Sequence, residues 1–435
     1  MLVLSATLLA VPSCLGDVDD GTADAMGGAG GTPATAGTSA GLAGADTGGT
    51  VTGGAAASGG SGGGEGGNGG GAGFGGVPFA DPADDFIFVW TGAELPLAEG
   101  DGSYDFIVDW GDGTSNEITS ATDTDKQHDY ATPGPHVVTI RGTFEGLRFG
   151  EGCSGYWNPE WGEDEDPACN DYVSLAPDLD EIRQWGSFRF GAVPSAFEDA
   201  SNLVVTATDT PDLSPPTTLV GAFEGCSKVE DIPSLDQWDV SHITNMAAMF
   251  RDTPFNGDLS TWDTSSVNDM AYMFEGTTAF NGDLSGWDTS QVTSMAHMFA
   301  NAISFDGNLS AWDTSSVIGM SGTFQGALAF NGDISSWDTS SVRYMNAMFS
   351  GASSFDQDLS AWDIGALTEA ADMFSDSGLS TAHYDAILIS WAAQETQDNV
   401  EFGAEGIQYS TAAVAARAVL TEERGWNITD GGLAP

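Results

Sequence analysis

Apolar residues recur at a fixed spacing along residues 238–374, with polar residues between them. Each copy of the pattern carries one tryptophan, and the next tryptophan follows 24 or 25 residues later; the six are Trp238, Trp262, Trp287, Trp312, Trp337 and Trp362. A constant period in this range is typical of a solenoid, in which every copy forms one coil and stacks on the next. The sequence therefore predicts a stack of about 25-residue coils.

The second copy shows the elements expected in one coil. Val267, Met270 and Phe274 follow helical spacings of three and four, which predicts a short helical turn from about Ser266 to Phe274. The alternation from Leu284 to Trp287 predicts a short strand. One such coil buries too little apolar surface to offset the entropy of ordering its residues. Its stability is therefore expected to come from the neighbouring coils.

Methionine is concentrated in the repeats, which hold ten of the twelve in the chain. A methionine-rich metal or cofactor site is one interpretation. Their inward positions favour the other, in which pliable thioethers fill gaps in a core. The ten are Met246, Met249, Met270, Met273, Met295, Met298, Met320, Met345, Met348 and Met373.

The pattern changes on both sides of the repeats. A segment rich in Gly, Ala, Ser and Thr cannot offset the entropy of ordering and predicts a disordered tether, and short alternating strands after it predict a small β-sandwich. Near the end, a helix is expected from about Thr411 to Arg424, stopped by Gly425 and followed by a strand. The chain then divides into a leader (1–14), a linker (15–77), the sandwich (78–144), an insertion (145–178), the solenoid (179–380) and a C-terminal cap (381–435).

The charge is strongly negative. Lys and Arg total 10 against 64 Asp and Glu, which gives a formal net charge of −54. Such a field repels phosphate backbones and anionic lipid headgroups, so nucleic acid is excluded as a partner. It suits a soluble protein in an exterior where counter-ions screen the repulsion.

The first residues, MLVLSATLLAVPSC, are an apolar run that ends at a cysteine. This pattern predicts a secretory signal, because the run is too short to span a bilayer. Residues 11–14 resemble a bacterial lipobox, which implies a lipid on Cys14 and a lipid-anchored protein at the cell surface or outer membrane. No Lys or Arg precedes the run and Pro12 departs from the pattern. Plain secretion and a free structural Cys14 stay open as alternatives.

The insertion is acidic and rich in aromatic residues. Cys153 and Cys169 predict a disulfide that closes this loop in an exported protein, with a metal pair as the weaker alternative. Tyr156, Trp157 and Trp161 are candidates for stacking on a sugar or contacting a peptide. The alternative is that they cover the neighbouring domain. The remaining cysteine, Cys226, is expected to be a buried small side chain.

One aspartate follows each tryptophan of the repeats: Asp239, Asp263, Asp288, Asp313, Asp338 and Asp363. Stacked coils bring these acids close together, so their repulsion needs compensation. In the sequence Asp-Thr-Ser-Ser-Val the carboxylate can accept backbone N–H groups two or three residues on. A ladder of calcium ions is the alternative, and it is the one cofactor the sequence suggests.

Two resemblances follow from these motifs. DWGDG at residues 109–113 and HDYATPG at residues 128–134 resemble the PKD-like β-sandwich. FNGDLSGWDTSQVTSMAHMFANA at residues 280–302 and FNGDISSWDTSSVRYMNAMFSGA at residues 330–352 resemble the repeats of BspA-like bacterial surface proteins, which are also found in mycoplasma-type lipoproteins. This second resemblance implies a mixed β/α fold with a right-handed leucine-rich-repeat-like solenoid. It also implies attachment or recognition at the cell surface, without catalytic residues.

No catalytic constellation accompanies the repeats. None of the five histidines has a two-histidine metal spacing, and no Gly-x-Ser-x-Gly motif is present. We expect a non-catalytic binding or adhesion protein whose partner is a protein or glycan. Exposed residues that vary between copies favour binding; they are Asn268-Asp269, Thr293-Ser294, Ile318-Gly319 and Arg343-Tyr344. A structural spacer or matrix component is the alternative, and a carbohydrate-active enzyme is less favoured.

Overall fold

The computed structural model describes residues 82–97, 103–145, 147–150, 176–192, 194–215 and 217–435. By its internal contacts the chain divides into residues 1–75 and 76–435, and the second unit is described here by itself. The predicted leader, the linker and most of the insertion lie outside the described residues. So do the residues predicted for lipidation, the disulfide and ligand contact: Cys14, Cys153, Cys169, Tyr156, Trp157 and Trp161.

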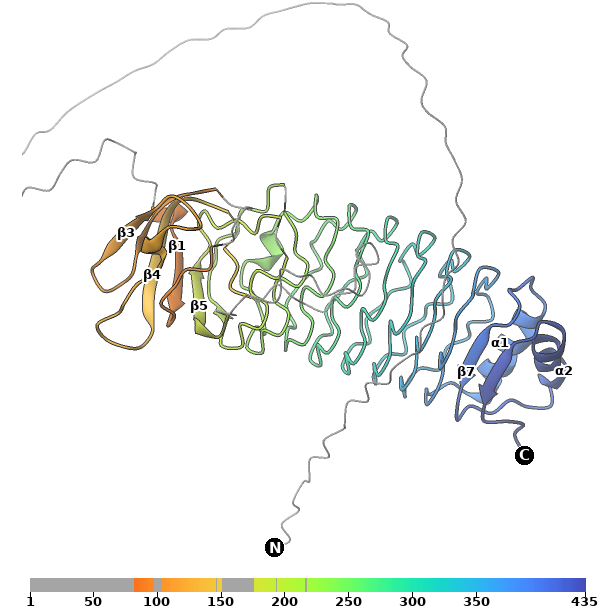
Figure 1. Ribbon diagram of the computed structural model, residues 1–435. Coiled ribbons are helices and arrows are strands. Elements are labelled where there is room, and N and C mark those ends of the chain that lie inside the picture. Colours follow the sequence, from red (N-terminus) through yellow and green to blue (C-terminus); the bar gives the residue numbers. More distant parts are fainter. Residues whose placement is uncertain (1–81, 98–102, 146, 151–175, 193, 216) are drawn as a thin grey trace, which may run out of the picture. The chain divides into compact units, whose positions relative to one another are not determined.

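A six-stranded sheet forms the first part of the described chain (Figure 1). Its order is β3-β2-β4-β1-β5-β6. The strands are β1 (Phe86–Trp90), β2 (Tyr104–Asp109), β3 (Ser115–Ile118), β4 (His136–Phe144), β5 (Leu179–Gln184) and β6 (Val204–Val205). Short 3-10 turns accompany them at η1 (Pro82–Asp84), η2 (Thr124–Lys126) and η4 (Ala176–Asp178), and another, η5 (Leu235–Gln237), follows. Neighbouring strands are antiparallel except β5 and β6, which are parallel.

The sheet departs from the predicted sandwich. Asp112-Gly113, within the DWGDG motif, lies in a hairpin, because β2 pairs with β3 from Asp109↔Ser115 onward. The described strands of residues 82–144 lie in one sheet, and β1 pairs on its other side with β5. The boundary placed at residue 179 is therefore wrong, since it separates β5 from its own sheet. Parallel pairing of β5 with β6 then leads from this sheet into the repeats.

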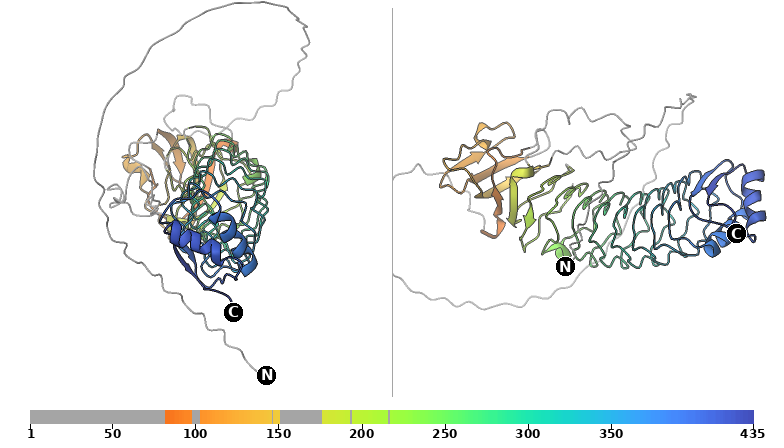
Figure 2. Two further views of the ribbon diagram at one scale, coloured as in Figure 1. Left: turned by 90° about the vertical axis from the view of Figure 1, so that its right-hand side faces the viewer. Right: turned by 90° about the horizontal axis from the view of Figure 1, so that it is seen from below.

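Consecutive repeat copies lie side by side along the stack (Figure 2), and backbone hydrogen bonds join each copy to the next. In one copy the N–H groups of Met295, His297, Phe299 and Asn301 donate to carbonyls of the next copy at 2.6–3.0 Å. The same four-bond pattern recurs from copy to copy. Parallel bridges link equivalent residues along the series Asn245, Asp269, Ser294, Gly319, Tyr344 and Glu369. We call these positions and the residues just before them the bridge face.

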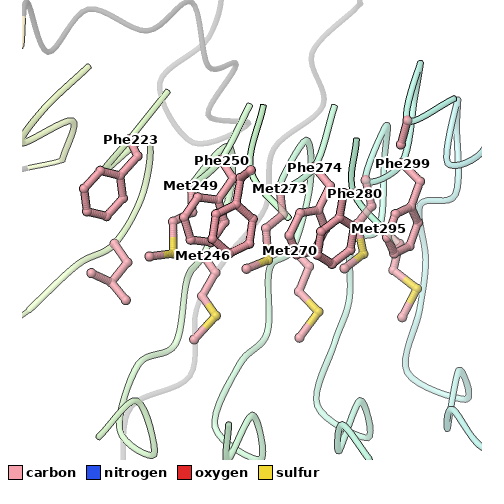
Figure 3. Packing of buried hydrophobic residues seen from close by; sticks show 14 of the residues in the cluster. Phe223, Met246, Met249, Phe250, Met270, Met273, Phe274, Phe280, Met295 and Phe299 are labelled. Atoms are coloured by element: carbon pink, nitrogen blue, oxygen red, sulfur yellow. The ribbon is translucent and has the colours of Figure 1, made fainter. Parts of the chain in front are cut away.

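The apolar side chains form ladders inside the stack (Figure 3). Equivalent rings of adjacent copies lie nearly parallel; for Trp287 and Trp312 the centroids are 6.3 Å apart and the planes differ by 2°. The Trp287 indole N–H donates to the carbonyl of Leu259, in the preceding copy, at 3.0 Å. All ten repeat methionines are buried. Their predicted role in core packing is confirmed.

The predicted elements within a copy are wrong. The segment from Ser266 to Phe274 contains turns and a bridge rather than a helical turn, and Leu284 to Trp287 forms a turn rather than a strand. The reason is a pair of left-handed residues in each copy. Tyr272 has φ of 61° and Gly276 has φ of 70°. Positive φ breaks a right-handed helix, so the N–H groups point to the next copy instead of four residues back.

The C-terminal cap closes the stack with two helices and a parallel strand pair. It contains α1 (Thr381–Ala392), β7 (Glu401–Ala404), α2 (Val414–Ala418), a π-helical turn η6 (Val419–Glu423) and β8 (Asn427–Asp430). The helix predicted from Thr411 to Arg424 is present as α2 and η6, and the strand after Gly425 is β8. Helix α1 was not predicted. Among the described residues, no helix has the length and apolar character needed to cross a membrane.

Candidate functional site

The aspartates after the tryptophans stabilise turns. The Asp263 carboxylate accepts the backbone N–H of Ser265 at 3.1 Å and its hydroxyl at 2.6 Å. Equivalent backbone bonds are made by Asp239, Asp288, Asp313, Asp338 and Asp363. These bonds lower the pKa of Asp263 and Asp288, the serine side chain being the largest cause. The turn-capping interpretation is confirmed. Among the described residues no group of three or more His, Cys, Asp or Glu side chains could hold a metal ion.

A second ladder of Asn and Asp side chains was missed by the sequence analysis. Each side-chain Oδ1 accepts the backbone N–H of the equivalent residue in the next copy at 2.9–3.0 Å. The ladder contains Asn256, Asn281, Asp306, Asn331 and Asp356. The signal in the sequence was the repeated Phe-Asn/Asp before each Leu-Ser or Ile-Ser. This ladder is structural because its acceptor atoms are occupied by backbone donors.

The first copies carry a row of charged side chains that are buried or half-buried. Glu198, Glu224, Arg251 and Glu275 occupy equivalent positions, each just before a left-handed residue. The guanidinium of Arg251 lies 3.3 Å from the Glu224 carboxylate and 2.8 Å from that of Glu275. Burial, together with the repulsion of Glu198, raises the pKa of Glu224 to about 7. Asp199 and Asp252 add to this repulsion, while Arg251 opposes it.

Two histidines of the repeats, His242 and His297, contact other residues of the stack. His297 stacks on Tyr272 with ring centroids 5.0 Å apart. The guanidinium carbon of Arg251 lies over the Tyr272 ring, 5.5 Å from its centroid. His242 bonds through Nε2 to the carbonyl of Leu213. Burial lowers the pKa of His297. These histidines contribute packing and hydrogen bonds to the stack.

Side chains on the bridge face differ between copies, and several of them are exposed. Ile318 is 44% exposed and Tyr344 is 40% exposed. Arg343 is also exposed and forms no ion pair with the described residues. Its N–H donates to the carbonyl of Ile318 at 2.9 Å, so these side chains lie on adjacent copies. Exposed aromatic and Arg side chains next to an aliphatic one are typical of protein interaction surfaces.

Comparison with known proteins agrees with the mycoplasma-type repeat resemblance. Residues 217–320 and residues 304–402 each match the family described as "Mycoplasma protein of unknown function, DUF285". The two matches cover the repeats and end within β7. No curated protein and no solved structure matches the chain. Over its repeat region, the chain is similar to this mycoplasma-type repeat family.

Removing one turn acceptor distinguishes capping from calcium binding. Asp288→Ala is expected to lower the free energy of unfolding by about 1 kcal/mol, because it leaves the N–H of Ser290 without its acceptor. Asp288→Asn retains an acceptor oxygen and is expected to lose less than half of that. Chemical denaturation with and without millimolar calcium measures both effects. Stabilisation by calcium that Asp288→Asn abolishes would contradict the capping role.

Stability is expected to depend on pH through Glu224. Its pKa rises from an ordinary 4.5 in the unfolded chain to about 7 in the fold, so the folded state holds the proton more tightly. This contribution is present at acid pH and is lost as the pH rises from about 4.5 to about 7. Relative to Glu224→Gln, the wild type should lose about 1 to 2 kcal/mol between pH 5 and pH 7.

Urea denaturation at several pH values measures this difference. Glu230→Gln, at an exposed position on the same copy, is the matched control and should follow the wild type. Parallel pH profiles for the wild type and Glu224→Gln would contradict the proposed burial of the Glu224 proton.

Proposed function

We propose that this chain is a non-catalytic binding protein displayed at the cell surface, with the bridge face as its recognition surface. A signal sequence and a lipid on Cys14 would anchor it, and the Gly-rich linker would hold the folded part away from the membrane. Its partner is a protein or a glycan on another cell or in a matrix. We also propose that the repeats form a right-handed leucine-rich-type solenoid and that a PKD-like domain precedes it.

The observation that carries the proposal is the difference between the two kinds of position in each copy. Inward positions repeat the same Trp, Met and Phe side chains, and they are buried. Bridge-face positions change from Asn268-Asp269 to Ile318-Gly319 and then to Arg343-Tyr344. Regular packing holds these different side chains in adjacent rows on a rigid scaffold. Varied side chains on a rigid scaffold are typical of recognition surfaces.

A structural spacer in the envelope is the second candidate. The stack of bonded copies would suit this role, because each copy adds a fixed unit of length. A spacer has no use for exposed Ile318, Tyr344 and Arg343 on one face. The spacer is therefore the less favoured function.

A ligand array tests the proposal directly. The full chain should bind at least one class among surface glycans and matrix proteins, with a dissociation constant in the micromolar range or below. Substitution of the bridge face, by Tyr344→Ala together with Ile318→Ser, should weaken that binding at least about tenfold. Thr261→Ala together with Ser336→Ala, at exposed sites away from this face, is the control. Failure to bind any ligand class would favour the spacer.

A further inference from the structure

An open notch lies on the bridge face beside Tyr344. Gly319 pairs with Tyr344 in a parallel bridge, so the two residues occupy adjacent copies about 4.8 Å apart. A Cβ atom added at Gly319 would meet only the Ser294 Oγ, at 3.9 Å, within a 4 Å radius. The space over the glycine backbone is therefore open. We call this feature the Gly319 notch. Ser294 and Tyr344 lie on the copies to either side of it, and Ile318 and Arg343 immediately precede Gly319 and Tyr344 in the chain.

The walls of the notch differ in chemistry. Tyr344 is 40% exposed and has no aromatic partner among the described residues, so part of its ring is available to a ligand. Ile318, just before Gly319 in the chain, is 44% exposed and adds apolar surface next to the notch. The Ser294 Oγ lies on the opposite side and offers a hydrogen bond. Such a site fits a small ring with one apolar face and polar groups at its edge.

Arg343 supplies a positive charge that the fold does not use. Residues 238–374 contain two basic side chains, Arg251 and Arg343. Arg251 is held between two glutamates, whereas Arg343 has no ion-pair partner among the described residues. The nearest acid along the bridge series is Glu369, and its carboxylate accepts the Asn346 side chain at 2.8 Å. In a chain with net charge −54, an exposed guanidinium without an acid is a place for an external anion.

We infer that the Gly319 notch binds a terminal carboxylated sugar residue of a glycan. This inference rests on the proposed binding function and names its ligand. The sugar ring would lie over Gly319 against Tyr344 and Ile318, and its carboxylate would pair with Arg343. The negative field of the protein repels polyanions. The ligand is therefore one acidic sugar at the end of an otherwise neutral glycan, rather than a polyuronate.

Isothermal titration of the full chain with two matched trisaccharides tests the inference. Both are neutral hexose chains, one ending in glucuronic acid and the other in glucose. The wild type should bind the acidic trisaccharide at least about tenfold more tightly, and the preference should weaken as salt is raised. Arg343→Gln should bind both equally. Tyr344→Ala and Gly319→Val should weaken binding of both, because one removes the ring and the other fills the notch.

Arg183→Gln is the control, since Arg183 is paired with Glu181 in β5. This variant should keep the preference for the acidic sugar, and the thermal midpoint should be measured for every variant to establish folding. Equal binding of the two trisaccharides by the wild type, or a preference that Arg343→Gln retains, would overturn the inference. An acidic peptide that binds through Arg343 when neither sugar does would also overturn it. In each of these cases, binding of another ligand class on the array keeps the proposed function, which fails only when no ligand class binds.

Discussion

The backbone hydrogen bonds between consecutive copies are the constraint on which the other features depend. Each copy presents alternate N–H groups, such as those of Met295 and His297, to carbonyls of the next copy. This geometry requires the chain to return to the same position after every circuit, which fixes the period. It also requires left-handed residues such as Tyr272, which cost about 1 kcal/mol or more each. The bonds and the ring ladders offset that strain.

Stacking places equivalent acidic residues of consecutive copies next to one another, as it does the apolar residues. The repulsion between these acids is reduced in a different way in each row. The aspartates after the tryptophans bind backbone N–H groups of their own turn, as Asp263 does. The second ladder mixes Asn and Asp, so that Asp306 lies between the neutral Asn281 and Asn331. The glutamate row instead inserts Arg251 between Glu224 and Glu275. Glu198 lies one copy before Glu224, and burial together with the repulsion of Glu198 raises the pKa of Glu224.

The sequence predicted which residues are buried better than it predicted the backbone. Regular spacing identified Val267, Met270 and Phe274 as apolar positions of one copy, and all three are buried. The spacing of Val267, Met270 and Phe274 resembled that of a helix. Short turns between these residues also bring their side chains to the same side of the backbone, facing the core. Positive φ at non-glycine residues could not be recognised from residue type. Ala347 has φ of 52°, and the equivalent residues of other copies, Tyr272 and His297, have φ of 61° and 55°. The bridge face was expected to vary, but the open space over Gly319 depends on neighbouring copies and required coordinates.

Deletion of one whole copy tests the central claim most directly. The claim is that each copy forms backbone hydrogen bonds only with its two neighbours, through equivalent positions. Removing residues 290–314, which is one period, joins Thr289 to Ser315 and restores the Asp-Thr-Ser-Ser sequence. The shortened protein is expected to unfold in one cooperative transition at a somewhat lower denaturant concentration, with amide protection of the remaining ladder intact. Removal of about 20 residues from the same place breaks the register and should abolish that protection. Equal damage from the two deletions would contradict this account.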